Sequence, residues 1–122
     1  MANKILVVDD SLLVRKQVGN AFTNAGYTVV EAADGAEALE KLKLHADVSL
    51  VVCDVNMPRM NGIEFLQQMR PGVPVVMLTT EGQPEIVQRA RELGAKGWIL
   101  KPFKPDHLLA AAKKLIATSL SK

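Results

Sequence analysis

Three acidic residues of this chain directly follow apolar runs. Asp9 and Asp10 follow one run of Val, Ile and Leu residues, and Asp54 follows another. Buried parallel strands have such near-continuous apolar runs, and α/β sheets place their sites at the carboxyl ends of these strands. Three clustered carboxylates repel one another, so they stay ionised together only where a cation lies among them. Lys101, which follows a third apolar run, is one candidate for this cation, and a divalent metal ion is the other.

The chemistry expected of this cluster is phosphoryl transfer with a magnesium ion. Carboxylate oxygens without His or Cys suit Mg²⁺ better than zinc, and Mg²⁺ often shares oxygens of a substrate phosphate. Asp54 leads into an irregular loop at residues 56–62, which lets its carboxylate face solvent and attack phosphorus to form an acyl phosphate. The phosphoryl oxygens then need partners, for which Mg²⁺, Lys101 and the Thr79 hydroxyl are available.

Strand and helix patterns alternate along the whole chain. Apolar runs predict strands at residues 4–8, 28–32, 48–53, 74–78 and 98–100. A helical pattern follows each run. Gly26 ends the first helix, whose apolar face is predicted to be Val14, Val18, Ala21, Phe22 and Ala25.

Five strand–helix units predict an α/β fold, with a doubly wound, five-stranded parallel sheet and five helices on its two faces. By analogy with flavodoxin-like folds, we expect the strand order 2-1-3-4-5. This order places the first and third strands side by side. It therefore brings Asp9, Asp10 and Asp54 together at one edge of the sheet.

Composition restricts the class of protein further. The 122 residues fit one domain, and 48% of them are apolar, which is enough for a core without disulfides. The single cysteine, Cys53, is predicted to be a buried structural thiol. The N-terminus lacks the apolar region typical of a signal peptide, and no run approaches the ~20 apolar residues of a membrane span. The net charge of +2 is too small to indicate nucleic-acid binding. We therefore expect a cytoplasmic protein that binds neither membrane nor nucleic acid.

Four motifs, taken in their order and spacing, resemble the receiver domain of two-component response regulators, over essentially the whole chain. They are Val7-Val8-Asp9-Asp10-Ser11, Asp54–Gly62, Leu78-Thr79-Thr80-Glu81 and Lys101-Pro102-Phe103. The resemblance implies that Asp54 accepts the phosphoryl group and that Asp9 and Asp10 hold Mg²⁺. It implies Asp54 and the backbone carbonyl of Asn56 as further ligands. Lys101 would bind the phosphate, and its bond to Pro102 is expected to be cis.

The same resemblance assigns residues to a conformational switch. It implies that the Thr79 hydroxyl senses the phosphoryl group and that Asn56 and Glu81 control access of the hydrolytic water. Trp98 occupies the place of the family's switch aromatic, which is more often Tyr or Phe. Because side chains alternate along a strand, Trp98 is expected on the face opposite Lys101, where a partner protein would dock.

These features predict one stand-alone receiver domain over residues 1–122, whose only catalysis is its own phosphorylation and dephosphorylation. The motifs with Asn56, Glu81 and Trp98 are similar to those of CheY-type chemotaxis regulators. The expected partners are therefore a histidine kinase and the flagellar motor switch protein or another protein target, and the chain is expected to be a monomer. A phosphorelay intermediate, which passes phosphate between histidine proteins, is the close alternative.

Two alternatives come from other classes of protein. A small haloacid-dehalogenase-like phosphatase also uses an Asp, a Thr or Ser and a Lys, but its first two acids stand one residue apart, whereas Asp9 and Asp10 are adjacent. It also needs an acidic pair late in the chain, where Asp106 stands alone. A flavodoxin-like FMN carrier needs a first loop that attracts phosphate, which two adjacent carboxylates would repel.

Overall fold

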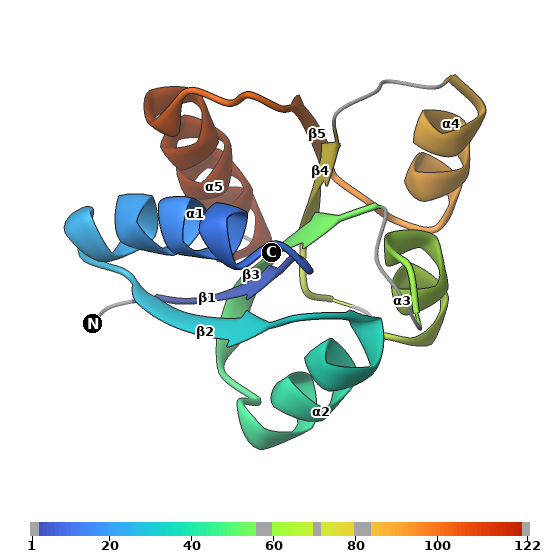
Figure 1. Cartoon of the computed structure of the whole chain (residues 1–122), viewed down its shortest axis with the longest axis horizontal. Coiled ribbons are helices and arrows are strands. Elements are labelled where there is room, and N and C mark those ends of the chain that lie inside the picture. Colours follow the sequence, from blue (N-terminus) through green and yellow to red (C-terminus); the bar gives the residue numbers. More distant parts are fainter. Residues whose placement is uncertain (1–2, 56–59, 70–71, 80–83, 121–122) are drawn as a thin grey trace.

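The computed structural model describes residues 3–55, 60–69, 72–79 and 84–120. Strands and helices alternate along these ranges as the sequence predicts (Figure 1). In chain order the elements are β1 (Lys4–Val8), α1 (Leu12–Asn24), β2 (Thr28–Ala32), α2 (Gly35–Leu44), β3 (Val48–Asp54), α3 (Gly62–Gln68), β4 (Val75–Thr79), α4 (Pro84–Glu92), β5 (Gly97–Leu100) and α5 (Pro105–Leu120).

The five strands form one parallel sheet in the order β2-β1-β3-β4-β5, which confirms the predicted flavodoxin-like topology. β1 lies between β2 and β3, and Val8 at its end stands opposite Ala32 on one side and Cys53 on the other. The residues that follow β1 and end β3 therefore lie at the same edge of the sheet. This edge is a topological switch point, because the connections from the two neighbouring strands run to opposite sides. Open α/β sheets bind ligands at such points.

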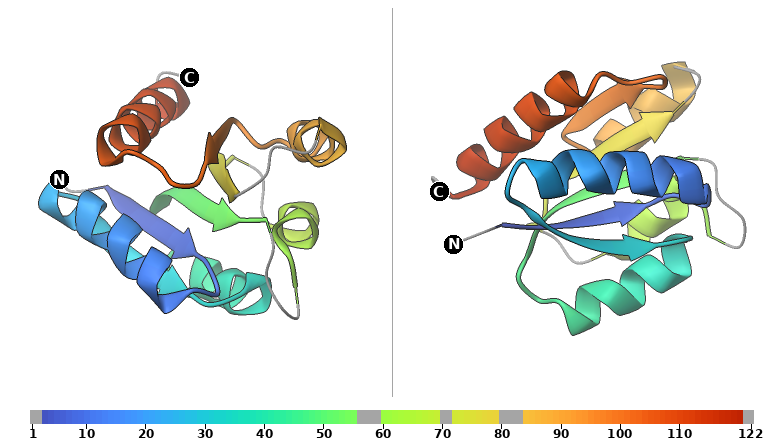
Figure 2. Two further views of the ribbon diagram at one scale, coloured as in Figure 1. Left: turned by 45° about the horizontal axis from the view of Figure 1, so that its top comes forward. Right: turned by 60° about the vertical axis from the view of Figure 1, so that its left-hand side comes forward.

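Helices cover both faces of the sheet and create two cores. Figures 1 and 2 show α1 and α5 on one face and α2, α3 and α4 on the other. Along β1 the side chains alternate between these cores: Ile5 and Val7 pack under α1 and α5, whereas Leu6 and Val8 pack toward α2 and α3. All four are completely buried, which explains the uninterrupted apolar run of this central strand.

Polar residues and one glycine define the ends of the helices. Ser11 caps α1 through its hydroxyl, which accepts a hydrogen bond from the Val14 N–H at 3.3 Å. Asn61 and Glu64 form a capping box at the start of α3. Gly26, with φ of 98°, follows the end of α1 as predicted. None of the described helices is long and apolar enough to cross a membrane.

The structure corrects the predicted apolar face of α1 at one position. Val18 and Phe22 are buried as expected, but Ala25 is exposed. The helix ends at Asn24, and Ala25 is its C-cap with non-helical dihedral angles, so the helical period no longer applies to its side chain. Cys53 is completely buried, which confirms the prediction for the thiol.

Candidate functional site

The acidic residues at the strand ends form one cluster. One carboxylate oxygen from each of Asp9, Asp10 and Asp54 lies within 4.8 Å of the others. Asp9 and Asp54 are almost fully buried, with 1% and 6% exposure, whereas Asp10 is exposed. Two buried carboxylates at this separation are unfavourable unless positive charge compensates them. The cluster predicted from the strand ends is therefore present, and it requires a cation.

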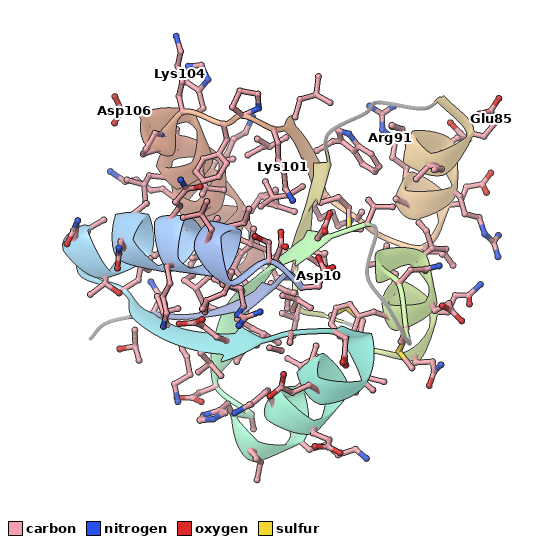
Figure 3. The ribbon with its side chains drawn as sticks, viewed as in Figure 1. Asp10, Glu85, Arg91, Lys101, Lys104 and Asp106 are labelled. Carbon is pink, nitrogen blue, oxygen red and sulfur yellow. The ribbon has the colours of Figure 1, made fainter. Side chains whose placement is uncertain are left out.

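Lys101 supplies positive charge to the cluster. Its Nζ lies 2.9 Å from Asp9 Oδ2 and 3.6 Å from Asp54 Oδ1. Figure 3 places Lys101 and Asp10 at the same end of the sheet. The peptide bond from Lys101 to Pro102 is cis, as the resemblance implies. One ammonium group among three carboxylates leaves the cluster with net negative charge, so a further cation would be attracted to it.

Asp9 is held through every polar atom that it has. Its N–H donates to the Ala32 carbonyl at 3.1 Å, and its own carbonyl accepts a hydrogen bond from Arg15 Nη1 at 2.7 Å. The carboxylate accepts at Oδ1 from the Ser11 N–H at 2.8 Å and at Oδ2 from Lys101 Nζ at 2.9 Å. These four bonds fix both the backbone and the side chain of Asp9 before any metal ion arrives.

The position of Asp54 depends on a close approach of α3. The Gly62 N–H donates to the Val55 carbonyl at 2.9 Å, and Val55 in turn donates to the Leu78 carbonyl at 3.2 Å. A Cβ atom on Gly62 would lie 2.5 Å from the Asp54 carbonyl oxygen and 2.8 Å from Met77 Cε. Only a glycine therefore lets α3 start this close to the backbone that carries Asp54.

Cys53 contributes packing rather than reactivity. Its Sγ donates to the Asp54 carbonyl at 3.2 Å, and the side chain is completely buried. Burial raises the pKa of the Cys53 thiol well above its usual value, and the negative charges of Asp54 and Asp9 raise it further. A thiol in this state is a poor nucleophile and a poor metal ligand, which leaves the cluster with oxygen donors.

Trp98 lies on the opposite face of β5 from its neighbour Ile99. Trp98 packs against the core near α4, to which Ile86 and Ala90 also belong, while Ile99 packs against the core under α5. The predicted alternation along this strand is thus confirmed. The indole Nε1 is buried and has no hydrogen-bond partner among the described residues. An unpaired buried N–H typically costs about 1–3 kcal/mol, so a position in which this N–H finds a partner would regain part of that cost.

Three predicted site residues lie partly or wholly outside the described residues. The backbone of Thr79 ends β4 and stands opposite Leu100, but its side chain is not described. Asn56 and Glu81 are outside the described ranges. The roles of the Thr79 hydroxyl, the Asn56 carbonyl and the Glu81 side chain therefore stay predictions from the sequence.

Comparison with known families and proteins shows which protein family the chain belongs to. Residues 5–113 match the family model of the response regulator receiver domain. The chain belongs to this receiver family. It is 38% identical over 122 residues to the chemotaxis protein CheY1 of Helicobacter pylori, with 95% of this chain and 98% of CheY1 covered.

Solved receiver structures agree with this membership. Chemotaxis protein CheY4 of Vibrio cholerae is 42% identical, with a TM-score of 0.88 and coverage of 94% of this chain and 99% of CheY4. A chain of the CheX–CheY–BeF₃–Mg²⁺ complex of Borrelia burgdorferi is 32% identical, with a TM-score of 0.87 and coverage of 93% and 88%. The chain is thus a receiver domain of two-component signalling, homologous to CheY chemotaxis regulators. It belongs neither to the haloacid-dehalogenase phosphatases nor to the FMN carriers.

Sequence reasoning did not predict the supporting roles of two residues of this receiver site: Arg15, and Gly62 at the end of the second motif. Arg15 and Lys16 lie near the start of α1, where positive charge opposes the helix dipole. This unfavourable placement is a signal that both cations have a local acidic partner, and the structure shows that partner to be Glu31. The sequence gives no comparable signal for Gly62, because its role depends on the distance between α3 and the end of β3.

Proposed function

We propose that this chain is a response regulator whose receiver domain carries the phosphorylation site. Its Asp54 accepts a phosphoryl group from a histidine kinase with Mg²⁺, and the phosphorylated protein binds a target in chemotaxis, the flagellar motor switch. The observation that carries the proposal is the cluster of Asp9, Asp10 and Asp54 within 4.8 Å, with the Lys101 amine among its members. Membership of the receiver family and similarity to chemotaxis proteins support it.

The donor set of the cluster fits Mg²⁺. Asp9, Asp10 and Asp54 offer carboxylate oxygens, which Mg²⁺ prefers, and the exposed Asp10 leaves room for water and phosphate oxygens. These three residues, with the backbone carbonyl of Asn56, would hold the ion. When bound, the ion offsets negative charge on the transferred phosphoryl group. The solved Borrelia burgdorferi complex contains Mg²⁺ and BeF₃, which supports Mg²⁺ as the metal for this chain.

The residues of the chain then have distinct tasks in the transfer. An Asp54 carboxylate oxygen attacks the phosphorus of the phosphohistidine. A phosphorus–oxygen bond forms and the phosphorus–nitrogen bond breaks, with its electron pair left on the kinase histidine. Lys101 moves from the two carboxylates to a phosphoryl oxygen, where its charge is needed. Asn56 and Glu81 control the later entry of hydrolytic water. The only reactions that the chain catalyses are its own phosphorylation and dephosphorylation.

The signal would leave through the open edge of the sheet at β5. The Thr79 hydroxyl bonds to a phosphoryl oxygen, and the resulting shift of β4 changes the packing of Trp98. Trp98 lines a hollow of about 570 Å³ between β5 and α5, together with Leu100, Lys104 and His107. A partly apolar, basic surface of this kind suits a protein target such as the motor switch protein.

The phosphodonor would approach on the side of α1. Leu12 and Leu13 at the start of this helix are 59% and 68% exposed, and a hollow of about 570 Å³ beside Lys101 is lined in part by Val14, Phe103 and Pro105. Large apolar side chains exposed beside an acceptor site suit contact with the helices of a kinase. We expect the chain to be a monomer and to bind both partners in the cytoplasm.

Incubation with acetyl phosphate and Mg²⁺, followed by mass spectrometry of the intact protein, tests this function. The wild-type chain should gain one phosphoryl group, and chelation of Mg²⁺ should prevent the gain. Asp54→Asn should gain none, because an amide is not a nucleophile of this type. Asp106→Asn, which alters an exposed acid of α5, serves as the matched control and should be labelled like the wild type. Equal labelling of Asp54→Asn would contradict the assignment.

A further inference from the structure

Arg15 joins the acid cluster to the edge strand of the sheet. Its Nη1 donates to the Asp9 carbonyl at 2.7 Å, and its Nε donates to Glu31 Oε1 at 3.2 Å. Glu31 lies on β2 and also accepts a hydrogen bond from Lys16 Nζ at 2.9 Å. The hydrogen bonds and charges of Lys16 and Arg15 lower the pKa of the Glu31 carboxyl despite its partial burial, so Glu31 is a stable anionic anchor at neutral pH.

The carbonyl that Arg15 holds belongs to the peptide unit between Asp9 and Asp10. A peptide unit is planar, so fixing the direction of its oxygen also fixes the direction in which the chain enters Asp10. Asp10 needs such support more than its neighbours, because it is exposed and its side chain has no hydrogen bond among the described residues. Asp9 has three hydrogen bonds besides the one from Arg15, and Asp54 is buried at the end of β3.

We propose that Arg15, anchored by Glu31, is a positioning residue that orients the Asp9–Asp10 peptide and so sets the affinity of the acid cluster for a divalent cation. The inference rests on the proposed function only in taking this cluster as the Mg²⁺ site. A guanidinium suits the task because its donors lie in one rigid plane, so one side chain can hold the Asp9 carbonyl and the Glu31 carboxylate together. A lysine in the same place offers a single nitrogen and cannot reproduce both bonds at these distances.

Positioning and simple electrostatics predict opposite effects. The Arg15 side chain is only 16% exposed, and its positive charge near the cluster opposes the binding of another cation. If charge were its only contribution, removal of Arg15 would strengthen Mg²⁺ binding. If Arg15 positions Asp10, removal would weaken Mg²⁺ binding, because ligands whose supporting hydrogen bonds are lost bind metal less well.

Calorimetric titration of the unphosphorylated protein with Mg²⁺ separates these effects. Arg15→Met should weaken binding roughly 10-fold, in the range typical of lost supporting bonds around a metal ligand. Arg15→Lys should not restore wild-type affinity, and Glu31→Gln, a milder change, should weaken binding in the same direction. Lys16→Met is the matched control, since Lys16 shares the anchor Glu31 but does not touch Asp9. It should bind Mg²⁺ as tightly as the wild type or slightly more tightly.

The NMR signal of the Asp10 amide gives a second readout, which a purely structural role of Arg15 would not move selectively. It should shift in Arg15→Met and Glu31→Gln and stay in place in Lys16→Met. If Arg15→Met and Glu31→Gln bind Mg²⁺ at least as tightly as the wild type, the inference is wrong while the proposed function stands. If the wild type itself binds no Mg²⁺, the metal site of the proposed function fails and this inference fails with it.

Discussion

Lys101 decides the charge of the candidate site in the absence of metal. Its amine lies within 3.6 Å of two nearly buried carboxylates, in the region where a divalent cation would also bind. Under the proposed function, lysine and Mg²⁺ would compete for the oxygens of Asp9 and Asp54, and the lysine would have to move before or during phosphoryl transfer. The same amine is expected to have two opposite effects, on metal affinity and on reaction rate.

Replacement of Lys101 by methionine tests this competition. Lys101→Met should bind Mg²⁺ more tightly, because the carboxylates lose a rival cation, and should be phosphorylated more slowly, because a phosphoryl oxygen loses its partner. Removal of a positioned charged donor of this kind typically costs on the order of 10²–10³ in rate. Calorimetry and the rate of labelling by acetyl phosphate measure the two effects. Lys104→Met is the control, since Lys104 is exposed, and weaker Mg²⁺ binding by Lys101→Met would contradict the competition.

Among the elements of the fold, the junction between β3 and α3 sets the position of Asp54, the proposed nucleophile. Gly62 lets the first turn of α3 lie against the backbone of Asp54 and Val55. This contact joins the sheet edge to a helix that also packs on the core through Phe65 and Leu66. A displacement of α3 would therefore be transmitted directly to Asp54.

Gly62→Ala should displace this junction. The added methyl group would lie 2.5 Å from the Asp54 carbonyl, so the backbone must shift, at a cost of about 1–3 kcal/mol in the free energy of unfolding. Phosphorylation by acetyl phosphate should also slow, because Asp54 leaves its place beside Lys101. Chemical denaturation and labelling rates measure the two changes. Gly19→Ala, where a Cβ meets only an ordinary contact of 3.5 Å with Val29, should keep the wild-type rate and lose no stability. Wild-type behaviour of Gly62→Ala would show that the junction tolerates movement.

The elements and the acid cluster could be predicted from sequence, but their supporting contacts could not. Apolar runs and helical periodicity are local properties that the sequence shows directly. Parallel strands end at one edge of the sheet, so the proximity of Asp9 and Asp54 follows from the strand order alone. The bond from Arg15 to the Asp9 carbonyl depends on the angle at which α1 leaves β1. The requirement for Gly62 depends on an interelement distance. Helical periodicity places Ala25 on the buried face of α1, because periodicity does not indicate the residue at which a helix ends.

Across the whole molecule, the proposed function requires a connection from the acid cluster to a surface on β5 and α5. Trp98 is suited to report this connection, because it is the one tryptophan of the chain and packs on the face of β5 opposite Ile99. Its buried Nε1 has no hydrogen-bond partner among the described residues. A different position in which this N–H reaches water or a polar partner would regain part of the cost of burial.

Tryptophan emission should therefore shift when acetyl phosphate and Mg²⁺ are added together. The shift should be absent without Mg²⁺ and in Asp54→Asn, and reduced in Thr79→Ala even though that variant is phosphorylated. A charge-assisted hydrogen bond from Thr79 is typically worth about 1.5–3 kcal/mol, enough to move a two-state equilibrium by one to two powers of ten. Mg²⁺ alone serves as the control for direct quenching. An unchanged spectrum at full phosphorylation would mean that Trp98 is a static core residue.

The proposed function makes Asp54 the single acceptor of the phosphoryl group in this chain. An acyl phosphate on aspartate is reduced by borohydride to homoserine, so reduction after phosphorylation marks the acceptor permanently. Peptide mapping by mass spectrometry then reads every acidic position at once, including Asp9 and Asp10 beside the acceptor. Homoserine is expected at position 54 alone, and only in samples that received both phosphodonor and Mg²⁺. Homoserine at position 9 or 10, or unmodified Asp54 in fully phosphorylated protein, would contradict it.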